Sequence, residues 1–238
     1  MIVILLIVGI GLRVGYRGFV EHPARDEMTY LSWVQKLSKN DISSLPTMHR
    51  ALIYIGILIE NIGFDVELGL RIFNIACALL WLLMMYLLGR TIFASSKAGL
   101  ICLTLAVFNP YMIQISGQIM REPLYLLVFS AGLFCAVQIV LDVGTLCYAS
   151  LLAPLTVLGI WSRDEGAEML LLMIGAMIFR GILIRHDSRR SPAGRRLVAA
   201  GVLYLLVLGI SATLLLHFCP ELTTAFRQNA LLVYHRII

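Results

Sequence analysis

The feature that most constrains this chain is a series of apolar runs, each about as long as a membrane's hydrocarbon core is thick. Such runs predict transmembrane helices, because an α-helix needs about 20 apolar residues to cross a bilayer. The predicted spans lie at about residues 1–17, 68–90, 97–116, 122–141, 145–161, 167–184 and 197–217. The sequence therefore predicts an all-α, polytopic bundle of about seven transmembrane helices.

The composition supports a membrane protein over a soluble domain. Apolar residues make up 60% of the chain and charged residues 14%, against roughly 45–50% and about 25% in ordinary soluble domains. A soluble fold would have to expose this apolar surface to water, whereas lipid accepts it. The five cysteines are odd in number and lie mostly inside apolar runs. This pattern predicts small buried side chains rather than a disulfide framework or a metal site.

Charges on the connections predict how the spans are oriented. If the first span runs outward, the inner connections carry an excess of Lys and Arg, as the positive-inside rule requires. The charged residues on that side are Arg90, Lys97, Asp142, Arg180, Arg185, Asp187, Arg189, Arg190, Arg195 and Arg196. Topology thus accounts for the net charge of +5, and nucleic acid is not an expected partner. The seventh span then leaves residues 218–238 as an outer C-terminal segment.

The largest connection, residues 18–67, lies on the predicted outer side. Within it, Tyr30, Trp33, Val34 and Leu37 recur at helical spacing, which predicts an amphipathic helix at the membrane interface. The run 51–64 is too short to cross a membrane and predicts a second helix lying on its surface. The predicted organisation is a transmembrane module over residues 1–217 that carries this outer loop, followed by the C-terminal segment.

Two adjacent carboxylates, Asp26 and Glu27, open the first outer helix. A helix N-terminus stabilises carboxylates as anions, and such a pair could act as a general base or bind a divalent cation. The alternative is structural: Asp26 caps the helix, and Glu27 decorates its first turn. The residues alone leave both interpretations open.

Further charged residues fall at the same predicted membrane face. Gln118, Arg121 and Glu122 lie between the third and fourth spans, and Arg163 follows the fifth. Ionisable groups at membrane depth usually face a cavity or a partner, and Arg can hold a phosphate through two parallel hydrogen bonds. The structural alternatives are an Arg121–Glu122 anchor at the interface and a tight polar turn at residues 163–166.

Arg13 and Arg71 lie near the outer ends of their spans. Each either binds an anionic group or extends its side chain to the lipid headgroups. A mixed basic and acidic site at one membrane face suits a substrate that is part lipid and part polar phosphate. A transporter would instead place polar groups near the midplane, on broken helices.

Several short motifs also occur in a characteristic order over about residues 3–185. They are Arg13, Asp26-Glu27-Met28-Thr29-Tyr30, Pro46, Tyr54, Gly63, Gly69 to Asn74 around Arg71, Tyr86 to Arg90 with Phe93, Asn109-Pro110, Glu122-Pro123 and Ile160 to Gly166 around Arg163. In these motifs the chain resembles the GT-C fold membrane glycosyltransferases of family 39, which include the protein O-mannosyltransferases and the lipid A aminoarabinose transferases. It departs from them in length, because such enzymes usually continue into further spans, and Tyr30 stands one place earlier than in bacterial members.

The resemblance implies transfer of a sugar from a polyprenyl-phosphate donor to an acceptor at the outer membrane face, with inversion. It implies that Asp26 is the base, with Glu27 as the second catalytic candidate. The implied substrate-binding residues are Arg13, Tyr30, Arg71, Gln118, Arg121, Glu122 and Arg163. A divalent cation is the one cofactor considered, although the residues show no metal-site spacing.

The expected partners are the sugar donor, membrane lipid, an acceptor that is a protein, a glycan or a lipid, and a partner subunit. The expected location is a prokaryotic plasma membrane. Two alternatives to an enzyme stay open. One is a non-catalytic subunit that binds lipid-linked sugar or assembles with a partner, and the other is a small transporter.

Overall fold

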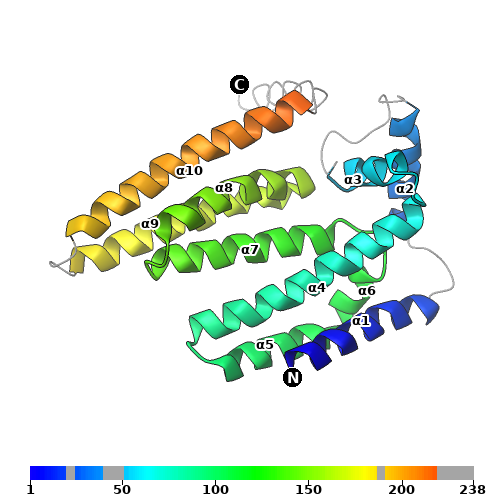
Figure 1. Ribbon diagram of the computed structural model, residues 1–238, viewed down its shortest axis with the longest axis horizontal. Helices are drawn as coiled ribbons and strands as arrows, with labels where there is room; N and C mark the ends of the chain where they lie inside the picture. Colours follow the sequence, from blue (N-terminus) through cyan, green and yellow to red (C-terminus); the bar gives the residue numbers. More distant parts are fainter. Residues whose placement is uncertain (20–24, 40–50, 187–190, 219–238) are drawn as a thin grey trace, which may run out of the picture.

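The chain folds as a bundle of helices in the computed structural model, which describes residues 1–19, 25–39, 51–186 and 191–218. Most of the long helices run side by side, while α2 and α3 lie at one end of the bundle (Figure 1). Every regular element of the described part is helical, which confirms the predicted all-α class. The elements are α1 (Ile2–Phe19), α2 (Arg25–Ser38), α3 (Ala51–Asn61), α4 (Val66–Ile92), α5 (Ser96–Val107), α6 (Pro110–Ser116), α7 (Glu122–Val140), α8 (Thr145–Ser162), the 3-10 helix η1 (Asp164–Ala167), α9 (Glu168–His186) and α10 (Ser191–Phe218).

Five segments are long and apolar enough to cross a membrane. They lie in α4, α7, α8 and α10 and in Glu165–Ile184, which covers most of α9. The pair α5 and α6 makes a sixth candidate, whereas the described apolar part of α1, Ile2–Tyr16, is shorter than a full span. The structure therefore fits an integral multi-pass membrane protein, with five or six of the seven predicted spans supported by length and composition. The predicted outer segment 218–238 lies, apart from Phe218, outside the described residues.

The third predicted span, 97–116, is not one continuous helix. It breaks after Val107 into α5 and α6, whose axes differ by 63°. The side chain of Asn109 accepts a hydrogen bond from the amide of Met112 at 3.1 Å, and Pro110 opens α6. An Asn cap followed by proline starts a new helix, because proline lacks the amide that would continue the old one. The prediction of a single straight span was wrong at this point.

The two predicted outer helices are present as α2 and α3. Tyr30, Val34 and Leu37 of α2 are buried, and they pack in one cluster with Leu52 and Ile53 of α3. The apolar stripe of α2 therefore faces protein rather than the headgroup layer for which it was predicted. Gly56 lets α3 lie close to α2, because a Cβ added at this position would lie 2.5 Å from the Val34 side chain.

The membrane-length helices pack as two groups. Buried side chains of α7 to α10 form most of one core, and those of α4, α5 and α6 form another, against which partly buried side chains of α1 pack. Many apolar side chains stay exposed, among them Leu105, Leu171 and Leu205. Lipid-facing helices are expected to show such faces, since lipid accepts what water would not. Pro154 lies inside α8 without ending it.

The opposite end of the bundle contains a buried arginine, Arg180, which the sequence analysis counted among the charges of the inner connections. Arg180 is 4% exposed within α9 and pairs with Asp142 in the α7–α8 turn at 2.7 Å. The same guanidinium donates to the carbonyl of Val140 at 3.1 Å. Arg180 thus ties α9 to the neighbouring turn. Among the cysteines the structure describes, all are free thiols; Cys77 and Cys135 are buried as predicted, whereas Cys102 is partly buried and Cys147 is exposed. Cys219 lies outside that part.

Candidate functional site

The predicted site residues come from elements that meet at one end of the bundle. The N-terminal ends of α4 and α7 and the C-terminal end of α8 lie at this end, close to α2 and α3 (Figure 1). The predicted residues carried there are Asp26, Glu27 and Tyr30 on α2, Arg71 on α4, Gln118 and Arg121 in the turn before α7, Glu122 on α7 and Arg163 after α8. We call this set the polar cluster.

Glu27 and Arg71 form a buried ion pair between α2 and α4. The Glu27 side chain is fully buried, and its Oε1 meets Nη2 of Arg71. Arg71 also pairs with the exposed Glu67 one turn earlier on α4, at 2.6 Å. A buried carboxylate needs a partner charge, which Arg71 supplies here. Arg71 therefore holds the α2 helix on α4 and does not extend freely to the headgroups.

Asp26, next to Glu27, is exposed. It makes no hydrogen bond or ion pair within the described part of the chain. Because α2 begins at Arg25, Asp26 lies inside the first helical turn rather than at the N-cap. The two carboxylates thus differ in kind: one is held in a buried pair, and the other is open to a ligand.

Tyr30 lies one turn after Asp26 and Glu27 and is 7% exposed. Burial raises the pKa of Tyr30 to about 12, which keeps its hydroxyl protonated at physiological pH. The charged side chains whose fields act on that hydroxyl are those of Arg121, Glu122, Asp26 and Arg163. Residues far apart in the sequence therefore lie near enough to Tyr30 for their charges to act on its hydroxyl.

Arg163 reaches across the cluster from the end of α8. Its Nε donates to Oε2 of Glu165 at 2.8 Å, and its Nη1 lies 3.5 Å from Oε1 of Glu122. Its guanidinium carbon also lies 5.7 Å from the centre of the Tyr125 ring. The hydrogen bond to Glu165 raises the pKa of Arg163. Arg163 is thus a fixed cation whose side chain is 28% exposed.

The turn that carries Arg163 is packed tightly against α8. A Cβ added at Gly166 would lie 2.1 Å from the carbonyl carbon of Gly159, so the two backbones touch at these glycines. The predicted tight polar turn is therefore present, and it also positions a member of the cluster.

Arg121 and Glu122 are adjacent at the start of α7, with 3.7 Å between Nε and Oε1. The local anchor predicted from sequence is thus present, but Glu122 also faces Arg163. Its Oε2 is buried without a hydrogen-bond partner. The Gln118 side chain is 8% exposed. We conclude that Glu122 connects two cations and keeps one oxygen free.

Asn74 of α4 was not predicted as a site residue, yet it holds the turn beneath Arg121. Its Nδ2 donates to the carbonyls of Gln118 and Met120 at 2.7 and 2.9 Å. Asn74 is fully buried. A lone amide inside a 27-residue apolar helix was the available signal in the sequence, because such a group needs a specific partner in a membrane.

The Arg13 backbone lies against Gly117, next to Gln118, but its guanidinium forms no ion pair with the described carboxylates of the polar cluster. Its guanidinium is fully buried and turns back along α1 to donate to the carbonyl of Gly9 at 3.0 Å. A Cβ added at Gly9 would lie close to Arg13, to Leu82 of α4 and to Val107, the last residue of α5. Its Nε and Nη2 have no hydrogen-bond partner. The structure therefore supports neither a headgroup contact for Arg13 nor a direct contact with the polar cluster.

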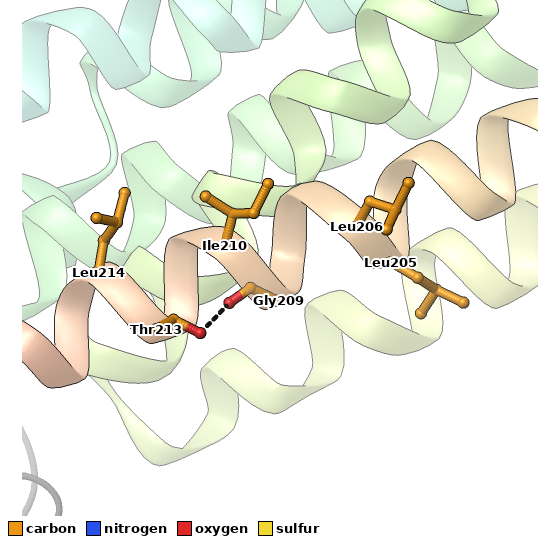
Figure 2. Close-up of a pocket in the computed structure, with 6 residues that line it drawn as sticks. All are labelled: Leu205, Leu206, Gly209, Ile210, Thr213 and Leu214. Carbon is orange, nitrogen blue, oxygen red and sulfur yellow. Dashed lines mark hydrogen bonds between the residues drawn. The ribbon is translucent and has the colours of Figure 1, made fainter.

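A separate hollow of about 420 Å³ lies along the C-terminal half of α10 (Figure 2). Its one polar side chain, Thr213, donates to the carbonyl of Gly209 in its own helix at 2.8 Å. The described residues that line it are Leu205, Leu206, Gly209, Ile210, Thr213 and Leu214. This apolar surface is suited to lipid chains and offers no group for catalysis.

No metal centre is formed by the described residues, among which no group of three or more His, Cys, Asp or Glu side chains is placed to hold an ion. In comparisons with known proteins, no family model, no curated protein and no solved structure matches this chain. The assignment of a function therefore depends on the polar cluster and on the physical chemistry of its groups.

Proposed function

We propose that this protein is a membrane glycosyltransferase that moves a sugar from a polyprenyl-phosphate donor to an acceptor at the outer membrane face. The observation that carries the proposal is the convergence of an open carboxylate, Asp26, and two cations, Arg121 and Arg163, around Tyr30 at one end of a membrane bundle. Inverting transfer needs a base for the acceptor and positive charge for the departing phosphate. The polar cluster contains both.

In the proposed reaction, Asp26 takes the proton from an acceptor hydroxyl. The acceptor oxygen then forms a bond to the anomeric carbon from the side opposite the phosphate. The bond between that carbon and the phosphate oxygen breaks, and the electron pair leaves with the polyprenyl phosphate. Arg163 and Arg121 stabilise the negative charge that develops there. Sugar transfer therefore proceeds with inversion.

The ion pairs give the carboxylates of Glu27 and Asp26 different roles. Glu27 is buried against Arg71 and keeps α2 in place, so it is a positioning residue in this proposal rather than a second base. Asp26 is exposed and adjacent, which suits a group that must meet an acceptor. Glu122 bridges toward Arg163 and orients it. Arg13 supports the packing of α1 rather than binding the donor phosphate.

A transfer assay on the purified, detergent-solubilised chain tests the proposal. Radiolabelled polyprenyl-phosphate sugars serve as donors and membrane extract as the source of protein, glycan and lipid acceptors. We expect the wild type to form a labelled product and Asp26→Asn to lower the rate by about 100-fold or more, as removal of a general base does. Glu60→Gln, which alters an exposed carboxylate of α3, is the matched control and keeps full activity.

Two outcomes of that assay would contradict the proposal. If Asp26→Asn transfers sugar at the wild-type rate, Asp26 is not the base. If the folded wild type binds the donor yet forms no product, even with membrane extract as a source of a partner subunit, the chain is a lipid-linked-sugar-binding subunit rather than an enzyme. A prokaryotic plasma membrane remains the proposed location.

One observation favours transport as a second candidate function. The α5–α6 span is broken at Phe108–Asn109, and the buried Arg13 side chain lies near Val107 at the end of α5. Broken helices with a nearby charge are typical of transporter sites. Transport predicts movement of a radiolabelled substrate into sealed vesicles with no covalent product, whereas sugar transfer predicts a covalent product from solubilised protein.

A further inference from the structure

We propose that Asn74 is a positioning residue for the polar cluster. It fixes Arg121 and Glu122, before and at the start of α7, relative to the pair of Arg71 and Glu27. It lies one turn after Arg71 on α4 and donates to the carbonyls of Gln118 and Met120, immediately before Arg121 and Glu122. The functional part of this inference rests on the proposed glycosyltransferase activity. The structural part does not.

The carbonyls of Gln118 and Met120, which accept hydrogen bonds from Asn74, lie in a turn between two helices. Helical hydrogen bonds therefore do not satisfy them. Between α6, which ends at Ser116, and α7, which begins at Glu122, helical hydrogen bonds reach only Gly117 and Arg121 at the two edges, and no described backbone amide donates to the carbonyls of Gln118 and Met120. Buried carbonyls without partners are costly, above all at membrane depth. A primary amide supplies two N–H donors from one nitrogen, so Asn74 can satisfy two carbonyls that point toward one spot.

The position of Asn74 links this turn to a different part of the site. Three residues along a helix place side chains on neighbouring positions of one face. Asn74 and Arg71 therefore lie on the same side of α4, one holding the 117–121 turn and the other holding Glu27 of α2. A shift of the turn would move Arg121 and Glu122 away from Tyr30, while the pair between α2 and α4 stayed in place. Asn74 thus acts through these residues and does not itself contact substrate.

Hydrogen–deuterium exchange combined with transfer kinetics tests this role. Asn74→Leu has a similar shape but no donor. We expect exchange of the amides of residues 117–122 to become about tenfold faster, since two buried hydrogen bonds are lost. The kcat for sugar transfer should fall by about tenfold with little change in the KM for the donor. Asn74→Gln, which keeps the donors, should recover part of both effects.

Thr156→Val is the matched control, because it removes another buried polar contact. The Thr156 hydroxyl is bonded within α8 and lies 3.1 Å from the hydroxyl of Tyr204. We expect Thr156→Val to alter stability without altering kcat or exchange at residues 117–122. A merely structural role for Asn74 would leave kcat of Asn74→Leu unchanged, as in this control, even where exchange at residues 117–122 becomes faster.

The possible failures are distinguishable. Unchanged exchange at residues 117–122 in Asn74→Leu would overturn the positioning role. Faster exchange with an unchanged kcat would overturn the link between that turn and the site. An inactive wild type would overturn the proposed function, and the exchange result would still decide whether Asn74 holds the turn.

Discussion

At the scale of single residues, the structure separates charges that look alike in the sequence. Asp26 and Glu27 are neighbours in sequence, but one is exposed and the other is fully buried. Three arginines, Arg13, Arg71 and Arg163, were candidate phosphate ligands or anchors, and their partners differ. Arg71 is held by two carboxylates, Arg163 by one hydrogen-bonded carboxylate, and Arg13 by a carbonyl of its own helix.

The pair between Glu27 and Arg71 should be strongly coupled. Glu27→Gln leaves a buried cation with only its exposed partner Glu67, so we expect a loss of about 2–4 kcal/mol in the free energy of unfolding. Glu27→Leu combined with Arg71→Leu should lose less than the two single changes together, because neither charge then stays buried alone. A double-mutant cycle from unfolding curves in detergent measures this. Strictly additive effects would show that the pair contributes nothing.

The pH dependence of Tyr30 follows from its burial, which raises its pKa from 10.0 to about 12. Because the folded pKa is the higher one, stability from the neutral hydroxyl is complete below pH 10.0 and is lost as the pH rises toward 12. An ultraviolet titration of tyrosinate, taken as the difference between wild type and Tyr30→Phe, checks this. Ionisation of Tyr30 with a midpoint at or below 10.0 would contradict the buried site.

At the scale of elements, hydrophobic period and length predicted most of the helices but not their interruptions. The apolar runs located α4, α7, α8, α9 and α10, because lipid requires long apolar helices whatever their neighbours are. The break between α5 and α6 was not predicted, although Asn109-Pro110 was visible in the sequence. Its Asn cap and proline follow a local rule that an apolar-run count does not include.

The junction between α8 and η1 should be intolerant of any side chain at Gly166. In Gly166→Ala the new methyl would overlap the backbone of Gly159, so we expect a loss of about 1–3 kcal/mol in stability together with reduced sugar transfer, because Arg163 moves with the turn. Gly175→Ala in α9 is the control, since nothing lies within 4 Å of its Cβ. That change should be neutral or stabilising by up to about 1 kcal/mol. Unfolding midpoints and sugar-transfer rates are measured for both variants. Equal values for Gly166→Ala and Gly175→Ala would contradict the close contact between Gly166 and Gly159.

At the scale of the whole molecule, the sequence predicted the class of structure and the shared location of the site residues. Positive-inside topology predicted that the candidate residues share one membrane face, and the elements that carry the polar cluster meet at one end of the bundle. The sequence could not predict which side chains pair with one another. Whether Arg71 meets Glu27, or Asn74 meets the 117–121 turn, depends on how distant segments pack. A residue pattern within one segment does not contain that information.

Accessibility of position 26 tests most directly whether the polar cluster is an outward-facing donor site. In a background without the native cysteines, Asp26→Cys should react with a membrane-impermeant maleimide in right-side-out vesicles. A polyprenyl-phosphate sugar should slow that reaction, and a polyprenol without phosphate should not. Ser96→Cys, exposed at the opposite end of the bundle, should react only after permeabilisation. Labelling of position 26 from the inside, or labelling that the donor does not slow, would contradict the account.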